Sequence, residues 1–178
     1  MNNKLWNECA RFHGHKCPGL AIGFKACELA IEKLNIRFSN DEEIVCVVEN
    51  DACGVDAVQY ITGCTFGKGN LLFKDRGKQA FSFFNRDNDD SIRLVFKGIE
   101  YDGNKEGKQN FILNTPATKL FEIKKPEFNV PQRAKIFKSI VCESCGELAA
   151  ESRIRIQDGK KVCLDCYEHY DRGGNINF

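Results

Sequence analysis

The sequence lacks any long hydrophobic run. No window approaches about 18 consecutive apolar residues, so we expect no membrane span. It also lacks an excess of charge, because 26 Lys and Arg stand against 25 Asp and Glu. A net charge near zero favours neither nucleic acid nor an anionic membrane as a partner. Residues 1–8 are too polar for a signal peptide, and we therefore expect a cytoplasmic protein.

Recognisable nucleotide-binding signatures are missing as well. The stretch from Gly63 to Gly69 is superficially similar to a phosphate-binding loop, but it has one residue too few between its first two glycines. Gly69 also stands where a Ser or Thr would hold magnesium. We therefore do not expect nucleotide hydrolysis. The sequence contains no glycine fingerprint for a dinucleotide, no internal repeat and no low-complexity segment.

Cysteine, by contrast, is abundant, with ten residues in a chain of 178. Disulfides are rare in the cytoplasm, so these cysteines need another explanation. Metal ligation and thiol chemistry are the main candidates, with buried packing for the remainder. Three of the ten lie on apolar faces of expected helices or strands and are predicted to be core residues: Cys9, Cys27 and Cys46.

The most concentrated chemistry lies near the N-terminus, where His13, His15 and Cys17 fall within five residues. Pro18 suits the first position of a helix, which the apolar spacing extends to Leu34. Cys17 would then lie at the helix N-terminus, where free N–H groups and the macrodipole favour a thiolate. A thiolate and imidazoles at short spacing suit a soft or borderline metal, and they also suit a reactive cysteine.

The remaining pattern favours an α+β fold, with helices packed on a mainly antiparallel sheet. Helices are expected over 4–12, 18–34 and about 52–62, and a short helix over 114–121. Strands are expected over 44–48, 71–74, 79–85 and 92–96, with a hairpin-like turn at 75–78. Residues 100–108 are expected to form a loop or a helix start.

Two prolines at 126 and 131 indicate a linker. We therefore expect a core domain over 1–125, a linker over 126–138 and a small zinc-binding module over 139–178.

The C-terminal module carries the most specific local motif, two Cys-x-x-Cys pairs separated by 17 residues: Cys142, Cys145, Cys163 and Cys166. This spacing is typical of a structural four-cysteine zinc site. Asp158-Gly159 predicts a hairpin between the pairs, and a short helix is expected to follow Cys166. Together these features indicate a treble-clef or zinc-ribbon module. From Pro131 onward, the sequence has eight Lys and Arg and seven Asp and Glu. Its net charge is therefore close to zero, and nucleic acid is not the expected partner.

A second cysteine-rich block runs from Val48 to Leu71. Three groups of residues in the N-terminal part together resemble the FmdE family, which takes its name from a component of formylmethanofuran dehydrogenase: Phe12-His13-Gly14-His15 with Cys17-Pro18-Gly19; Asp51-x-Cys53-x-x-Asp56-Ala57; and Thr62-Gly63-Cys64-Thr65 with Gly67-Lys68-Gly69. The resemblance covers about residues 5–125, and the zinc module is similar to that of some members.

The resemblance implies an α+β core, a cavity lined by cysteine and histidine that holds metal, and a homodimer. It also implies association with a larger molybdenum or tungsten oxidoreductase, although members occur as free-standing proteins. It does not imply a particular reaction for this chain.

The residues themselves suggest a second metal site, with zinc as the expected transition metal. Cys53 would lie in the first turn of its helix, as Cys17 does, and the expected ligands are His13, His15, Cys17 and Cys53. Cys17, Cys53 and Asp56 are the catalytic candidates, and Asp56 is either a general base or a surface charge.

Cys64 follows Cys53 by eleven residues, roughly 16 Å along a helix, and is therefore expected at the cavity's rim. With Lys68, which either meets an anionic ligand or is a plain loop lysine, it forms the expected cofactor-binding pair.

Three functions remain open at this point. The first is a metal- or thiol-dependent enzyme of anaerobic one-carbon or redox metabolism. The second is a non-catalytic metal-binding subunit of a larger oxidoreductase, and the third is a zinc-finger regulator. An exchangeable metal ligand favours the first, a closed four-ligand site the second, and salt-dependent binding to DNA the third.

Overall fold

The computed structural model describes residues 3–170, which fall into two compact units divided after Ala134. Each unit has its own strands and its own cysteine cluster. Within residues 3–170, no helix is long and apolar enough to cross a membrane.

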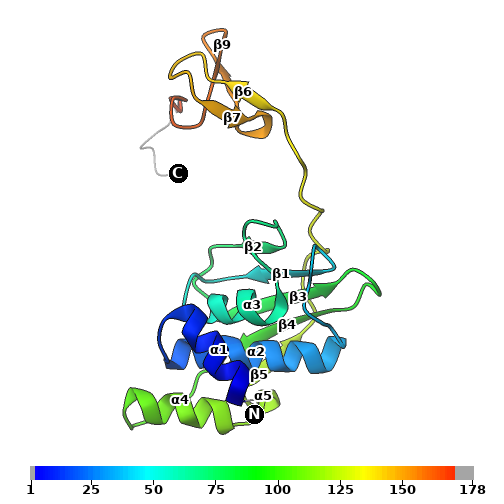
Figure 1. Ribbon diagram of the computed structural model, residues 1–178, viewed down its shortest axis with the longest axis vertical. Coiled ribbons are helices and arrows are strands. Elements are labelled where there is room, and N and C mark those ends of the chain that lie inside the picture. Colours follow the sequence, from blue (N-terminus) through cyan, green and yellow to red (C-terminus); the bar gives the residue numbers. More distant parts are fainter. Residues whose placement is uncertain (1–2, 171–178) are drawn as a thin grey trace, which may run out of the picture. The chain divides into compact units, whose positions relative to one another are not determined.

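The first unit is built on a five-stranded sheet in the order β2-β1-β3-β4-β5 (Figure 1). Only the β1–β2 pair is parallel, and the other three pairs are antiparallel. The expected α+β class with a mainly antiparallel sheet is therefore confirmed. The strands are β1 (Ile44–Val48), β2 (Leu71–Phe73), β3 (Ala80–Asn85), β4 (Ser91–Phe96) and β5 (Phe121–Lys124).

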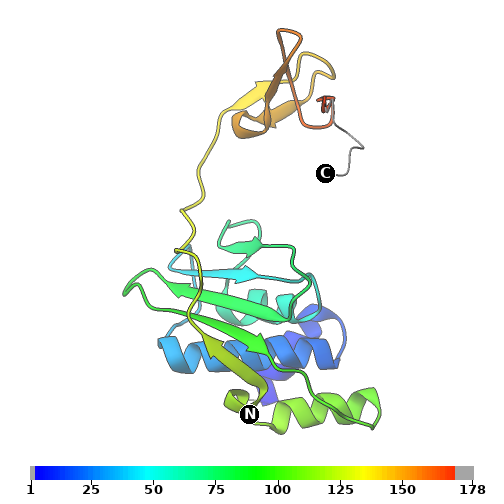
Figure 2. The same cartoon turned by 180° about the vertical axis from the view of Figure 1, so that it is seen from behind.

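The helices cover one face of this sheet, and the strands lie in front of them when the unit is seen from behind (Figure 2). They are α1 (Asn3–His13), α2 (Pro18–Leu34), α3 (Gly54–Thr62), α4 (Lys105–Asn114) and α5 (Ala117–Leu120). The central helix is α2, which contacts all four of the others. Its large apolar side chains, such as Leu20, Phe24 and Leu29, are completely buried in the main core.

The contact between α2 and α3 is unusually close because glycines meet there. A Cβ added to Gly23 would lie 2.5 Å from the Cα of Gly54, and one added to Gly54 would lie 3.2 Å from the Cα of Gly23. Real Cβ atoms do not approach backbone atoms as closely as 2.5 Å, so position 23 must be glycine for the two helix backbones to meet in this way. This contact brings the start of α2 beside the start of α3.

The other face of the sheet is covered by the segment from 125 to 134, which we call the strap. Phe128 of the strap packs against Phe84, with ring centroids 5.6 Å apart. Arg86 donates a hydrogen bond to the carbonyl of Pro131, and the amide of Ala134 donates to the carboxylate of Glu42. Most of the segment that we expected to be a linker is thus bonded to the sheet and to the loop before it.

The turn at 75–78 does not form the hairpin that we expected. Lys74 donates its backbone N–H to the carbonyl of Val48, and Lys78 donates to the carbonyl of Glu49. Both ends of the turn therefore bond to the end of β1, so β2 and β3 lie on opposite sides of β1 and do not pair with each other. The strand β5 and most of the helix α4 were also not predicted from the sequence.

The second unit contains two short hairpins, β6–β7 (Ser139–Val141 and Leu148–Ala150) and β8–β9 (Arg155–Gln157 and Lys160–Val162). A 3₁₀ turn over Glu151–Arg153 joins them. Asp158 and Gly159 both have positive φ, as the expected tight turn requires. The expected helix after Cys166 is absent from the described residues, because Glu168 donates its N–H to the side chain of Gln157 in the second hairpin.

We expect Gly23→Ala to lower the free energy of unfolding by about 2 kcal/mol, because the added methyl group forces α2 and α3 apart. Urea denaturation of the variant beside the wild type measures this change. Gly67→Ala is the matched control, since a Cβ there meets no atom within 4 Å. Equal stability of Gly23→Ala and wild type would contradict the close packing described above.

Candidate metal centre

Cys17 is held at the start of α2 by the local geometry of the helix. It is the N-cap residue, and its Sγ accepts a hydrogen bond from the N–H of Leu20 at 3.3 Å. Pro18 occupies the first helical position, where its missing N–H leaves no carbonyl unpaired. The expected position of Cys17 at a helix N-terminus is confirmed, and its half-buried sulfur lies where the helix dipole favours a negative charge.

Cys53 reaches the same place from α3, directly before Gly54. Gly19 of α2 makes room for it, since a Cβ on Gly19 would lie 3.3 Å from the Cβ of Cys53 and 3.9 Å from the sulfur of Cys17. Burial raises the pKa of the Cys53 thiol, and the neighbouring Cys17 thiol raises it further. A cation between the two sulfurs would oppose both effects, because it stabilises the thiolate form.

The two histidines come from the end of α1 and the loop that follows it. Gly14, with φ at +93°, turns the chain between them, and their ring centroids lie 4.4 Å apart. His13 Nδ1 lies 2.6 Å from an oxygen of Asp56, while its Nε2 lies 4.0 Å from the Cys17 sulfur. A proton on Nδ1, donated to Asp56, leaves the Nε2 lone pair directed toward the sulfurs.

The structure brings His13, His15, Cys17 and Cys53 together. One donor atom from each residue can be chosen so that all four lie within 4.8 Å of one another. Two imidazole nitrogens and two sulfurs form a donor set that suits tetrahedral zinc, so these residues fit the metal that we expected. His15 is exposed and the other three are half-buried, which makes His15 the ligand that solvent reaches most easily.

Asp56 lies beside this cluster, and one oxygen of its carboxylate contacts the ring of His13. Its second carboxylate oxygen accepts a hydrogen bond from Gln59 at 3.2 Å. Because one carboxylate oxygen contacts His13 and the other contacts Gln59, Asp56 is held where it orients the His13 ring. A carboxylate that holds a ligating histidine in this way typically strengthens the site by about tenfold to a hundredfold.

Two hollows border the cluster. The first, of about 430 Å³, is lined by His13, Cys53 and Asp56 together with two exposed rings, Phe66 and Phe73. The second, of about 390 Å³, is lined by residues that include His15, Cys17 and Gln109. The two phenylalanines and Gln109 were not predicted from the sequence, since an aromatic residue in a loop or at a strand end, or a glutamine in an unrecognised helix, belongs to no motif.

Cys64 and Lys68 are not brought to the cluster. Cys64 is completely buried, not at a cavity rim as we expected, and its thiol donates to the carbonyl of Ile44. Burial raises the pKa of Cys64 to about 11. Lys68 donates to the carbonyls of Ser39 and Asn40, so its ammonium group holds a loop and meets no hollow beside the cluster.

Cys9, Cys27 and Cys46 are buried in the main core, as expected. Burial raises the pKa of Cys9 to about 11, and the pKa values of the other two are raised well above the ordinary range of a thiol. These sulfurs remain protonated and act as small apolar groups.

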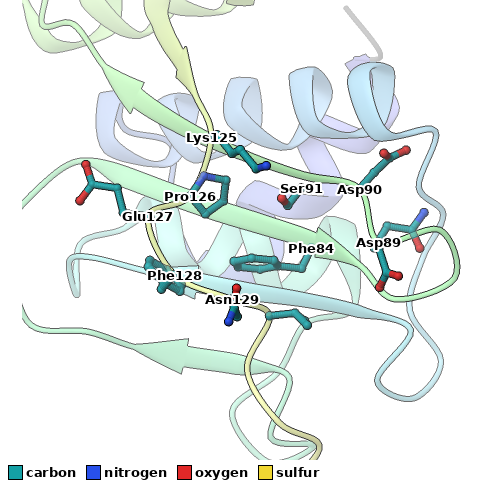
Figure 3. A pocket seen from close by; sticks show the side chains of 11 residues that line it. Phe84, Asp89, Asp90, Ser91, Lys125, Pro126, Glu127, Phe128 and Asn129 are labelled. Atoms are coloured by element: carbon teal, nitrogen blue, oxygen red, sulfur yellow. The ribbon is translucent and has the colours of Figure 1, made fainter.

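A further hollow of about 450 Å³ lies beside the strap, on the face of the sheet that the helices leave free (Figure 3). Lys125, Pro126 and Phe128 border it on one side, and Phe84 and Asp90 border it on the other. Neither a histidine nor a cysteine lines it. It is therefore separate from the cluster described above.

The second unit has a cluster of its own, formed by Cys142, Cys145, Cys163 and Cys166, whose sulfurs also lie within 4.8 Å of one another. Each pair forms a tight knuckle, and in the first of these Gly146, at φ +79°, donates to the carbonyl of Cys142. Backbone N–H groups of Cys145 and Cys163 lower the pKa of Cys142 to about 6. A thiolate already favoured by the backbone is what a metal ligand requires.

Comparison with known proteins gives two family matches. The model described as "FmdE, Molybdenum formylmethanofuran dehydrogenase operon" matches residues 12–139. The model described as "Prokaryotic dksA/traR C4-type zinc finger" matches residues 135–172 and so includes the second cysteine cluster.

One curated relative and one solved structure are similar over nearly the whole chain. A probable S-adenosyl-L-methionine-binding protein of Archaeoglobus fulgidus is 32% identical over 94% of this chain, which spans about half (53%) of that protein. The crystal structure of a tungsten formylmethanofuran dehydrogenase FmdE-like protein from Syntrophus aciditrophicus gives a TM-score of 0.61 at 22% identity. That match covers 97% of this chain and 92% of the other, and it shows a shared fold.

We expect Asp56→Asn to weaken zinc binding at the first cluster by about 10- to 100-fold, because the ring of His13 loses the carboxylate that orients it. Competition between metal-free protein and a chromophoric chelator for added zinc measures this affinity. Glu8→Gln is the control, since that carboxylate contacts Tyr60 and lies outside the cluster. Unchanged zinc affinity in Asp56→Asn would contradict the positioning role of the Asp56 carboxylate.

Proposed function

Because this chain belongs to the FmdE family, we propose that its first unit holds a transition metal ion, most simply zinc, through His13, His15, Cys17 and Cys53. The observation that carries the proposal is the convergence of these four donor atoms within 4.8 Å. They come from α1, the loop after it, and the starts of two helices, so the fold brings them together.

We also propose that a second zinc ion is structural and binds the four cysteines of the C-terminal unit. The match to a C4-type zinc finger and the clustered sulfurs support this assignment. Between residues 135 and 170, the unit contains little buried apolar surface besides the cysteines themselves, chiefly Val162. A module of this size therefore depends on the metal for its stability.

At the first centre, the chain's own residues would hold the ion and leave one side accessible. When bound, the ion supplies a Lewis acid that can polarise a carbonyl or bind a thiol. Asp56 holds His13 in position, Cys17 and Cys53 supply the anionic sulfurs, and exposed His15 is the ligand that an incoming group would replace most easily.

This arrangement favours a metal-dependent enzyme of anaerobic one-carbon or redox metabolism. The two hollows beside the cluster support it, because they give a small molecule access to the donors. The alternative is a non-catalytic metal-binding subunit of a larger oxidoreductase, which four protein ligands around one ion would support. A zinc-finger regulator is the least supported function, because the C-terminal part lacks the excess of positive charge that binding to DNA requires.

Two further features belong to the same proposal. All ten cysteines are free, which is what a reducing, cytoplasmic setting would maintain. We also propose a homodimer, on the ground of the family resemblance, and its mass in solution is the corresponding measurement.

A second candidate function is binding of S-adenosyl-L-methionine, which the name of the Archaeoglobus relative suggests. The hollow of about 430 Å³ favours it, since Phe66 is 74% exposed and Phe73 is 48% exposed on its walls. Aromatic faces attract a cationic sulfonium, and Asp51 and Asp56 add negative charge nearby.

We expect wild-type protein to carry two metal ions per chain when it is purified without oxygen, and Cys17→Ser and Cys142→Ser to carry one each. Elemental analysis provides the count, and cobalt substitution reveals sulfur ligands through their charge-transfer bands. Cys27→Ser, a change at a buried core cysteine, is expected to retain both ions. Two ions in Cys17→Ser, or a wild type whose single ion is lost in Cys142→Ser and retained in Cys17→Ser, would refute the first centre.

For the second candidate, we expect calorimetry to detect binding of S-adenosyl-L-methionine that falls at least about tenfold in the double variant Phe66→Ala, Phe73→Ala. Phe111→Ala is the matched control, because that ring is also exposed but lines neither hollow beside the cluster. No binding by the wild type would remove this candidate and leave the metal centre unaffected.

A further inference from the structure

The hollow of about 390 Å³ beside His15 and Cys17 is lined by polar groups that the metal centre does not use. They come from the loop before α2 and from the first half of α4. Its lining residues are His15, Lys16, Cys17, Pro18, Lys105, Glu106 and Gln109.

Gln109 is the notable member of this lining. It is only 6% exposed, and its side-chain amide makes no hydrogen bond to any residue between 3 and 170. Its amide atoms are not themselves fully enclosed, so they reach solvent or a ligand, which would supply the hydrogen bonds that the protein does not. Because Gln109 lines the hollow, this is where its partner would lie.

The charges around the hollow favour an anion. Lys16 and Lys105 are exposed at its edge, and Glu106 offsets one of them, which leaves one net positive charge among the lining side chains other than the metal ligands His15 and Cys17. Both α2 and α4 begin at this hollow, and helix N-termini add positive potential. A monoanion fits better than a phosphate, whose charge approaches two and which Glu106 would repel.

We propose that this hollow binds the carboxylate of a small organic acid whose other end reaches the metal centre. The Gln109 amide donates a hydrogen bond to the carboxylate, and the lysines supply the balancing charge. His15 and Cys17 line the same hollow, so one small molecule spans the carboxylate subsite and the donor atoms. This inference rests on the proposed metal centre and names the class of ligand that it takes.

The test compares two thiols of similar size that end in a carboxylate or a neutral amide, 3-mercaptopropionate and 3-mercaptopropionamide, by calorimetry on the zinc-loaded full chain. The thiol of each probe binds the metal, and only the first probe offers a carboxylate. We expect the acid to bind the wild type at least about tenfold more tightly than the amide does. In Gln109→Leu, which retains the volume of the side chain, this advantage is expected to fall below about threefold.

Two further variants complete the comparison. Lys105→Gln is expected to reduce the advantage of the acid without changing the binding of the amide, and it leaves the buried position intact if Gln109→Leu does not fold. Asn110→Ala, at the exposed neighbouring position, is the matched control and is expected to behave as the wild type. Equal affinity for the two probes in the wild type, or a full advantage in Gln109→Leu, would overturn the subsite.

The carboxylate subsite can also be tested if the metal centre is absent. If elemental analysis finds no ion in the first unit, the proposed centre fails, and propionate alone then tests the subsite. Its titration into the full chain is followed through the side-chain amide signals of Gln109 in a nitrogen-15 spectrum. Movement of those signals supports a carboxylate site without metal, and their constancy shows that only water meets the amide.

Discussion

The close approach of α2 and α3 is the constraint on which the rest of the first unit depends. Two backbones meet at Gly23 and Gly54, where a side chain at position 23 would collide with the neighbouring helix. The same crossing brings the two helix starts together, so Cys17 and Cys53 become neighbours without any loop having to reach across. Packing and chemistry therefore share one origin, because the contact that closes the core also places two of the donor atoms.

The ten cysteines show how environment separates residues of one type. Six of them lie in the two clusters, at helix starts or in tight knuckles, and backbone N–H groups donate to the sulfurs of Cys17 and Cys142. The other four are buried among apolar side chains: Cys9, Cys27, Cys46 and Cys64. Sequence spacing alone could not assign Cys64 correctly, since the motif that contains it lies on a loop whose path depends on tertiary hydrogen bonds.

Much of the fold follows from local signals. The helix from Pro18 to Leu34 and the strand from Ile44 to Val48 have the bounds that the sequence predicted, because an N-terminal proline and a run of β-branched residues act over short distances. The pairing of β2 was not predictable in this way. It depends on backbone groups at the end of β1, which carry no side-chain signal. The helix α4 was overlooked because Gly107 and the polar residues around it weaken its apolar pattern.

The donor atoms of the first centre also lie close together along the chain. His13 and Asp56 are 43 residues apart, and the elements between them are α2, β1 and the start of α3. Closing a loop of this length costs little more than closing a shorter one, since the entropic cost grows only with the logarithm of length. None of the four ligands comes from β4, β5 or the C-terminal unit. A nascent chain already contains every residue of the site when it has emerged as far as the end of α3.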